Sequence, residues 1–448
     1  MQQTVHSEPD VASDSVTGAP RRRVWLWGTN NPHIAEESWL LRGIVVLQLV
    51  AILGVAVLTL TSFEIWARLD EHAHYDYVET IADQHVLPNL RAHGKPGKLE
   101  MGRHTYEAFQ PPLYYLAAAP LLKLSHVEHT RVLILRTFDL LLLLGALYAT
   151  WRLAVVVFPD RPLWPFAFGL MFFLLPGVIV RSITISYQPL ATLLSVVFLA
   201  LLFKADRAPR DDANRWFLAA AFTFGLAMLT TLLTAPLGVM FGIVALRRLW
   251  RDRAWRTVGV FAACGVMLVA LLAPWLAFNE AHYGSLTSFS TARTLQQPLI
   301  NPDNHNYTVS EAPRIARVWI REAFLPNEWV VFVVTDHALD QVISLMFYLL
   351  VLLPVILVIV RPRTLLVDSA WYLALPLAIS IVFLEATTIT ANWPTFARYL
   401  YGAGPAWLLF VYVAVRQALR HWAAPMTVLA LGTAGAGCLW IQAGVRYF

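Results

Sequence analysis

The residues that could carry chemistry are concentrated in one polar stretch that follows the first long apolar run. From Arg68 to Gln110 this stretch holds five histidines and seven acidic residues. Ionisable groups gathered at the end of such a run indicate a functional site at a membrane edge. Asp70 and Glu71 come first. A carboxylate at a dry boundary has a raised pKa and can serve as a general base, although two acids that simply end a helix in water give the same pattern.

The spacing around His74 leaves two interpretations open. Asp70 and Glu71 precede His74 by four and three residues, so the three share a face if residues 70–83 are helical. Such a face could hold a divalent cation, or it could use His74 only to orient a neighbouring group. The stretch is therefore compatible with Mg²⁺ or Mn²⁺ but does not indicate a metal, and we assign no metal ligands.

A second motif lies about forty residues further on. Glu107 and Gln110 stand just before Pro111-Pro112. Proline suits the first turn of a helix and cannot continue a helix from upstream. We therefore expect a helix to begin after Pro112, with Glu107 and Gln110 at its outer mouth.

Composition defines the class of protein that must position these residues. Of the 448 residues, 58% are hydrophobic and 14% are charged, against about 25% charged in soluble domains. Apolar runs long enough to cross a bilayer recur along the chain, which excludes a soluble enzyme, a disordered chain and a disulfide scaffold. No basic run is interleaved with aromatic residues, so no nucleic-acid partner is expected. Cys264 and Cys438 lie inside apolar runs and predict buried free thiols.

The predicted fold is all-α, a polytopic transmembrane bundle of about 11–13 spans with short amphipathic helices in its outer loops. Residues 1–38 are expected to form a disordered or cytoplasmic tail, and residues 39–448 a single transmembrane domain. Basic clusters mark cytoplasmic loops, which places the loops at about 66–110 and 280–338 outside. The expected apolar segments are 41–65, 111–124, 133–158, 162–181, 189–203, 216–231, 233–246, 257–279, 339–360, 366–386, 399–415 and 424–444.

This topology contains a conflict of parity. Four apolar segments lie between residues 110 and 204, whereas loops on opposite sides of the membrane require an odd number. One segment must therefore be re-entrant, interfacial or broken. The short run after Pro111 and the stretch from Pro165 to Pro176 are the two candidates.

Three motifs together resemble a known superfamily. They are Asp70-Glu71 with a downstream Leu87-Pro88, the run Tyr-Glu-Ala-Phe-Gln-Pro-Pro-Leu-Tyr-Tyr at 106–115, and Ala-Arg-Tyr-Leu at 397–400. In this order they resemble the GT-C integral membrane glycosyltransferases, closest to the bacterial branch related to protein O-mannosyltransferases and aminoarabinose transferases. The resemblance covers about residues 40–415.

The resemblance implies a fold, an activity and a set of roles. Such an enzyme moves a sugar from a polyprenyl-phosphate carrier to a hydroxyl of a lipid, glycan or protein acceptor, on the outer face of the cytoplasmic membrane. Asp70 matches the catalytic base, with Glu71 beside it. The donor phosphate is expected at Arg398, Tyr399 and Arg181. Expected substrate contacts come from His74, Glu107, Gln110, Tyr114 and Trp393.

The chain also departs from the superfamily pattern. Relatives often carry an acid near the position of Ser186-Tyr187-Gln188 and a lysine after a run like Leu229–Leu232, and this chain has neither. Without that lysine, phosphate binding is left to Arg398, Arg181 or Arg136. Two alternatives remain open: a non-enzymatic lipid-glycan transporter or flippase, and an inactive scaffold subunit of a cell-envelope assembly.

Overall fold

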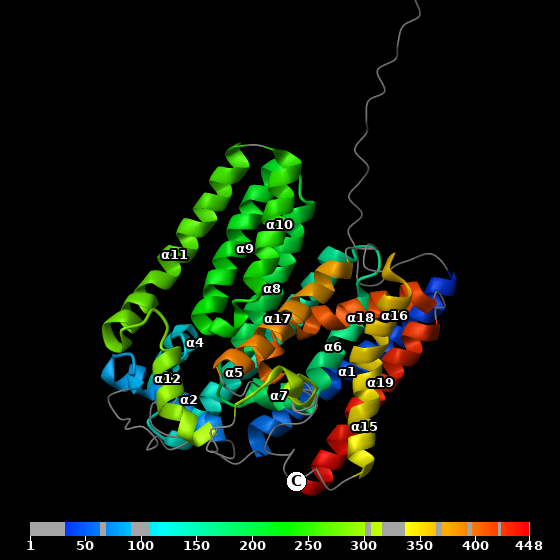
Figure 1. The fold of residues 1–448 in the computed structure, drawn as a ribbon. Coiled ribbons are helices and arrows are strands. Elements are labelled where there is room, and N and C mark those ends of the chain that lie inside the picture. The colour runs from blue at the N-terminus through cyan, green and yellow to red at the C-terminus, as the bar shows by residue number, and fades with distance from the viewer. Residues whose placement is uncertain are drawn as a thin grey trace, which may run out of the picture. The chain divides into compact units, whose positions relative to one another are not determined.

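A computed structural model describes residues 32–62, 69–90, 107–253, 255–300, 306–315, 337–363, 370–391, 397–419 and 423–447. From Leu41 onward the chain forms one compact unit, and the elements described in it are all helical (Figure 1). They are α1 (Pro32–Ser62), α2 (Leu69–Gln84), α4 (Leu113–Ala118), η1 (Ala119–Leu124), α5 (Glu128–Val157), α6 (Leu163–Leu174), α7 (Pro176–Ile183), α8 (Gln188–Arg207), α9 (Arg210–Thr230), η2 (Leu232–Thr234), α10 (Leu237–Asp252), α11 (Trp255–Tyr283), α12 (Phe289–Ile300), η3 (Val309–Glu311), α15 (His337–Phe347), η4 (Tyr348–Leu352), α16 (Leu353–Val360), α17 (Ala370–Ala391), η6 (Ala397–Leu400), α18 (Gly404–Leu419) and α19 (Ala423–Tyr447).

The chain is a multi-pass membrane protein. Within the described residues, eight helices are long and apolar enough to cross a bilayer: Trp39–Ser62, Glu128–Val157, Gln188–Arg207, Leu232–Asp252, Thr257–Tyr283, Gln341–Val360, Ala370–Ala391 and Ala423–Trp440. The all-α polytopic bundle expected from the sequence is confirmed. Within the described ranges the long apolar helices number eight, or nine if the bent pair α6–α7 is one span, and several other expected segments form short helices.

The two segments that could resolve the parity conflict, the run after Pro111 and the stretch from Pro165 to Pro176, are both interrupted. The run after Pro112 is a single turn and a half of α-helix that tightens into the 3₁₀-helix η1. Helices α6 and α7 bend by 72° at their junction. The bend has a local cause: Leu175 stands before Pro176 and takes an extended backbone conformation (φ −66°, ψ 127°), because a proline disfavours helical geometry in the residue before it.

The transmembrane core is built around two sets of closely packed helices. Helix α8 packs along α5 and α9, and α18 packs along α6 and α17 (Figure 1). Large aromatic side chains that are fully buried fill the space between them: Phe168, Phe173, Phe198, Phe203, Phe217 and Phe410. Helix α18 approaches α6 closely because Gly404 has no side chain, as is common where membrane helices cross.

The two cysteines differ in their surroundings. Cys264 on α11 is buried, as the sequence predicted, whereas Cys438 on α19 is exposed. The prediction of a buried thiol at Cys438 is therefore wrong. An apolar run in a membrane helix supplies a lipid-facing side as well as a core-facing side, and its composition does not distinguish the two.

A second, smaller core holds α2 against the membrane bundle. It consists mainly of tyrosines and aliphatic residues from α2, α4 and the start of α5. The rings of Tyr77 and Tyr115 stack with their centroids 3.7 Å apart, a geometry that stabilises the contact beyond simple burial. As expected, residues 70–83 are helical and a helix begins after Pro112.

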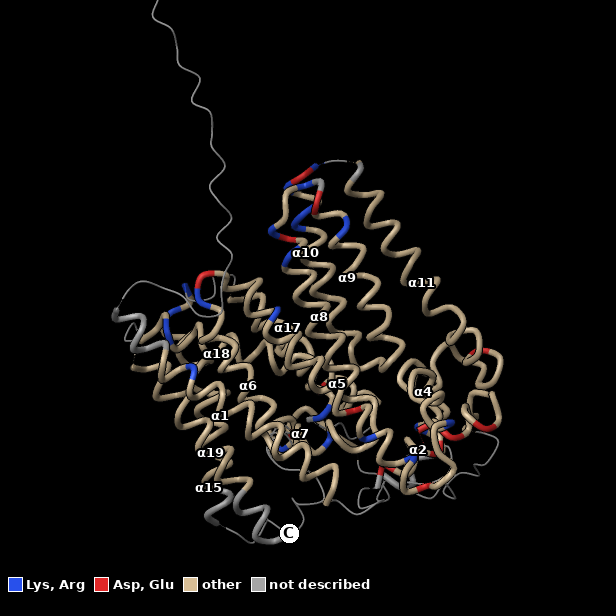
Figure 2. Tube along the Cα trace, turned by 180° about the vertical axis from the view of Figure 1, so that it is seen from behind, with Lys and Arg blue, Asp and Glu red and all other residues tan. Residues whose placement is uncertain are grey.

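Charged residues divide between the two ends of the bundle. Figure 2 shows Lys and Arg, with a few acidic residues among them, gathered at the ends of α9 and α10 that lie away from α2, and a mixture of acidic and basic residues around α2. The last turns of α8 and α18 also carry basic side chains. This division separates a basic end of the bundle from the end that holds the first polar stretch.

Gly404→Ala should destabilise the protein. A Cβ at this position would overlap the ring of Phe172 on α6, and overpacking of a tight core costs about 1–3 kcal/mol. Thermal unfolding in detergent should therefore show a lower Tm. Gly437→Ala in α19 is the matched control, because nothing lies within 4 Å of the added Cβ; an equal loss in both variants would contradict the packing argument.

Candidate active site

Two arginines from distant segments meet one carboxylate at the first turn of α2. Arg181 Nη1, from α7, and Arg398 Nη1, from η6, each lie 3.0 Å from Asp70 Oδ2. The three side chains keep only a small exposed fraction, 15% for Asp70, 7% for Arg181 and 11% for Arg398. Three residues that the sequence motifs predicted for the site thus form one contiguous cluster: Asp70, Arg181 and Arg398.

The charge of Asp70 is strongly stabilised in this cluster. Burial alone would raise the pKa of Asp70, but the guanidinium groups of Arg398 and Arg181 outweigh it and hold that pKa well below its ordinary value. One negative charge faces two positive ones, so the cluster carries an excess of positive charge. A second anion, such as a phosphate, is the natural complement to this excess.

Glu71, the neighbour of Asp70, points to a different partner. Successive residues of a helix are rotated by about 100°, and Glu71 thereby faces α5. Its carboxylate accepts two hydrogen bonds from Arg136, from Nε at 2.8 Å and from Nη2 at 2.7 Å, with both side chains buried. The backbone N–H of Ile185 donates to the same carboxylate at 3.2 Å.

Asp139, three residues further along α5, anchors the same region. Tyr114 Oη donates to Asp139 Oδ2 at 3.0 Å, and the backbone N–H of Ser186 donates to the same oxygen at 3.2 Å. The turn between α7 and α8 therefore gives two of its N–H groups to two buried carboxylates, as buried backbone donors require. Tyr114, expected to contact substrate, is fully buried and engaged in this network.

His74 lies one turn beyond Asp70 on α2, as its spacing predicted. Its Nδ1 lies 2.8 Å from Tyr115 Oη, and its ring packs edge-on against Tyr187. Burial lowers the pKa of His74 to about 3, and the nearby carboxylate of Asp70 opposes this shift only in part. His74 is therefore a neutral group that supports the aromatic wall of the site.

Glu107 and Gln110 lie beside the same cluster. Gln110 Nε2 donates to Glu107 Oε2 at 3.1 Å and to Tyr187 Oη at 3.4 Å. Burial, followed by the charge of Asp70, raises the pKa of Glu107 to about 7, although Arg398 counters part of the shift. Near neutral pH, Glu107 is thus divided between its neutral and ionised forms and can exchange a proton.

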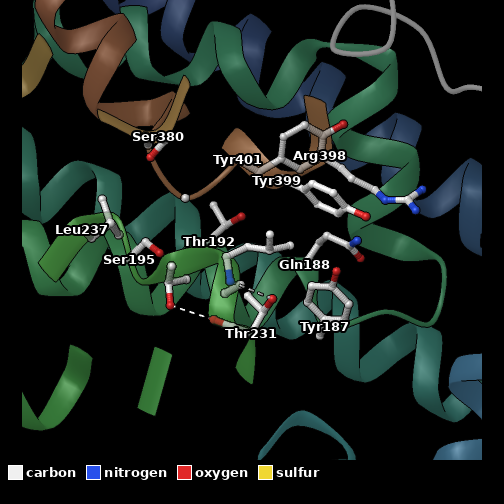
Figure 3. A pocket seen from close by; sticks show the side chains of 15 residues that line it. Tyr187, Gln188, Thr192, Ser195, Thr231, Leu237, Ser380, Arg398, Tyr399 and Tyr401 are labelled. Carbon is white, nitrogen blue, oxygen red and sulfur yellow. Dashed lines mark hydrogen bonds between the residues drawn. The ribbon is translucent and has the colours of Figure 1, made fainter. Parts of the chain in front are cut away.

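Two cavities open on either side of Tyr399. The first, of about 20 Å³, runs between α8, η2 and the segment after Arg398, and is narrow and lined by hydroxyl groups. Figure 3 shows Arg398 and Tyr399 at one side of it, facing Tyr187 and Gln188 of the α8 start. The second, of about 80 Å³, lies against Gln110 and shares Tyr399 with the first. The first cavity therefore reaches the charged cluster at Arg398, and the second lies against Gln110.

The width of the first cavity is limited by one close approach. A Cβ added to Gly402 would lie 2.6 Å from Ser195 Oγ, which is closer than real side chains come. Ser195 is fully buried, and Oγ has no hydrogen-bond partner within the described part of the chain. Glycine at 402 therefore lets the backbone reach the hydroxyl-lined wall of α8.

The cluster does not suit a divalent cation at Asp70. A metal bound there would meet the positive charges of Arg181 and Arg398 at close range. Within the described ranges, no group of three or more His, Cys, Asp or Glu side chains has the spacing to hold a metal. Compatibility with Mg²⁺ or Mn²⁺ therefore rests on the sequence alone.

The structure brings together most of the residues that the sequence singled out. Asp70 and the two arginines that contact it lie beside Glu107 and Gln110, which border the same site. Glu71 lies behind this site, against α5. Trp393 falls outside the described residues.

The roles of two residues at the site were not foreseen from the sequence. Arg136, left open as a phosphate ligand, is instead the partner of Glu71. Tyr187 was given no role, yet its hydroxyl accepts a hydrogen bond from Gln110 at the site. The signals for them were charges inside the apolar run of α5 and the departure from the superfamily pattern at 186–188.

Comparison with known proteins identifies the fold. No protein-family model and no curated protein sequence matches the chain. Among solved structures, ArnT from Cupriavidus metallidurans bound to undecaprenyl phosphate matches with a TM-score of 0.54 and 16% sequence identity. The oligosaccharyltransferase of Archaeoglobus fulgidus, in complex with Zn and sulfate, matches with a TM-score of 0.50 and 14% identity.

These matches define a fold that the chain shares over most of its length. Each covers 87% of this chain, but only 63% of the ArnT chain and 52% of the oligosaccharyltransferase chain. The chain therefore spans between half and two thirds of the proteins it resembles. The chain thus shares its fold with ArnT and with the oligosaccharyltransferase, in line with the fold that the sequence motifs implied.

Glu71→Gln should destabilise the fold. Breaking a buried ion pair by neutralising one partner leaves the other charge uncompensated and costs about 3–5 kcal/mol. Unfolding followed by tryptophan fluorescence should show the loss. Glu79→Gln is the matched control on the same helix: Glu79 pairs with Arg131 at 3.1 Å but is 39% exposed, so its loss should cost at most about 1 kcal/mol. Equal stability of Glu71→Gln and wild type would refute the anchoring role.

Proposed function

We propose that this chain is a GT-C glycosyltransferase that moves a sugar from a polyprenyl-phosphate carrier to an acceptor hydroxyl. The observation that carries the proposal is the convergence of Arg181 and Arg398 on Asp70. The fold supports it, since one of the matched structures was solved with undecaprenyl phosphate bound. The acceptor class, lipid, glycan or protein, follows from the family resemblance alone.

The proposed site faces the outside of the cytoplasmic membrane. Basic residues at the C-terminal ends of α8, α10 and α18 mark the cytoplasmic end of the bundle. Helix α2 and the start of α8 belong to the opposite end, since α8 rises about 30 Å over its 20 residues. A lipid-linked donor in the outer leaflet would then reach Arg398 from the side.

Arg398 and Arg181 are proposed to hold the donor phosphate, with Tyr399 beside it. The Arg398 guanidinium lies 5.5 Å from the Tyr399 ring centroid, which limits the orientations it can take. A phosphate group offers these guanidinium groups more oxygens than Asp70 does. The donor phosphate would thus bind the two arginines together with Asp70, and its negative charge would weaken their stabilisation of the Asp70 carboxylate. Positive charge at this point also stabilises the departing phosphate.

The reaction needs a group that accepts one proton. The acceptor oxygen attacks the anomeric carbon, the bond from that carbon to the phosphate oxygen breaks, and its electron pair stays on the phosphate. The proton of the acceptor hydroxyl must then go to a carboxylate, and we assign it to Asp70. Without donor, Asp70 is a poor base because the arginines hold its pKa low. A bound phosphate compensates those charges, so burial then raises the pKa of Asp70.

Glu107 is proposed as a second proton-accepting group, and Glu71 as a positioning group. Glu107 borders Asp70 and has a pKa of about 7, so it can take the proton onward and restore Asp70. Glu71, expected from sequence to be catalytic, is occupied by Arg136. Its proposed role is to fix the rotation of α2 and with it the direction of Asp70.

Asp70→Asn should abolish transfer while leaving donor binding in place. Loss of a general base costs about 10²–10⁴-fold in rate, whereas the arginines remain. Purified variants would be given radiolabelled polyprenyl-phosphate sugars with an envelope extract as acceptor source. Arg398→Ala should lose both transfer and binding. Asp76→Asn is the control on the same helix, since Asp76 forms its ion pair with His72, within α2, at 3.3 Å.

The outcomes separate this proposal from its alternatives. Equal transfer by wild type and Asp70→Asn would remove Asp70 as the base. Donor binding without transfer in the presence of a complete envelope extract would favour the transporter or scaffold alternative. Absence of both binding and transfer in the wild type would reject the proposed function.

The rate of transfer should rise as pH increases through about 7. Glu107 accepts a proton only when ionised, and its pKa of about 7 sets the midpoint of that ionisation. Glu107→Gln should flatten this rise and lower the rate above pH 7. Rates measured from acid to alkaline pH would check this, with Glu79→Gln as the control. An unchanged profile in Glu107→Gln would remove Glu107 from proton transfer.

A further inference from the structure

A third cavity lies at the end of the bundle away from Asp70. It has a volume of about 450 Å³ and is lined by residues from the end of α5, the loop after it, and the ends of α8 and α18: Val157, Phe158, Pro159, Asp160, Arg161, Arg207, Tyr412, Val413, Arg416 and Gln417. Three of these side chains are arginines and one is an aspartate. The cavity therefore has a net positive charge.

The cavity and the Asp70 site lie on opposite faces of the membrane. Helix α5 carries Arg136 near its start and reaches Val157 at its end, and α8 runs from Gln188 to Arg207. Each stretch of about 20 residues rises about 30 Å, which is the thickness of the bilayer hydrocarbon core. The arginine cavity thus opens at the face that the basic loops assign to the cytoplasm.

The arginines are held in place by the walls of the cavity. Arg207 Nη1 donates to the carbonyl of Val157 at 3.3 Å, and its guanidinium lies 4.1 Å from the Phe203 ring centroid. Arg416 Nη1 donates to Tyr412 Oη, and its guanidinium lies 5.8 Å from the same ring's centroid. Arginines at helix ends commonly satisfy the last carbonyls, but that role does not require a cavity of this size between them.

We propose that this cavity binds the phosphate group of an anionic phospholipid from the leaflet opposite the Asp70 site. Guanidinium forks match phosphate oxygens in pairs, and basic cavities between transmembrane helices at the cytoplasmic face recognise such headgroups. The aromatic floor formed by Phe158 and Tyr412 suits the glycerol and upper acyl region. This proposal is independent of the glycosyltransferase activity, because it concerns another cavity on the other face.

The test compares two lipids of different charge. The full chain in mild detergent is titrated with phosphatidylglycerol or phosphatidylcholine, and bound lipid is counted by native mass spectrometry. Wild type should prefer phosphatidylglycerol. Arg161→Gln, which alters an exposed side chain, should weaken that preference about fivefold, and Arg161→Gln with Arg416→Gln should weaken it further. Arg215→Gln is the control: Arg215 is 64% exposed and pairs with Asp212 outside the cavity.

Inorganic phosphate forms the second arm of the experiment. If it displaces phosphatidylglycerol at millimolar concentration and binds wild type but not Arg161→Gln, the site takes soluble phosphate and the lipid source is overturned. If wild type shows no preference for phosphatidylglycerol, or Arg161→Gln and the double variant keep it, the site itself is overturned. A preference lost in these variants and kept in Arg215→Gln supports the proposal.

Discussion

Glu71 and Arg136 meet where α2, α5 and the turn before α8 come together, and solvent reaches neither side chain. Moving a carboxylate and a guanidinium out of water costs several kcal/mol each. The pair is sustained because two parallel hydrogen bonds join it and the N–H of Ile185 adds a third donor. Such a demanding geometry permits one rotation of α2 about its axis. The direction of every other side chain on α2 follows from it.

Asp70 shows what that rotation achieves. It is one residue away from Glu71, yet it faces Arg181 of α7 and Arg398 of η6 instead of α5. Arg181 is available there because the α6–α7 bend turns a short helix toward α2. Arg398 is available because η6 precedes the tightly packed α18. The site thus depends on a broken helix and on a packed one, both arranged around a fixed carboxylate.

The sequence predicted those features that depend on residues close to one another in the chain. Apolar runs predicted the spans, Pro111-Pro112 predicted the start of α4, and the prolines at 165 and 176 pointed to the segment that bends. Helical spacing placed His74 on the same side of α2 as Asp70. Contacts across the fold were not predictable in this way. Glu71 and Arg136 are 65 residues apart, and Asp70 and Arg181 are 111 apart. Periodicity indicates which face a residue occupies, but not which distant residue lies opposite.

The lack of a side chain at Gly402 limits how the cavity between α8, η2 and the segment after Arg398 can change in sequence. A Cβ at position 402 would lie 2.6 Å from Ser195 Oγ, so a larger residue there would require Ser195 to shift. A bulkier residue at 402 therefore calls first for a smaller residue at 195, on α8. The order of such substitutions is therefore constrained, and α8 is where a change of preference would begin.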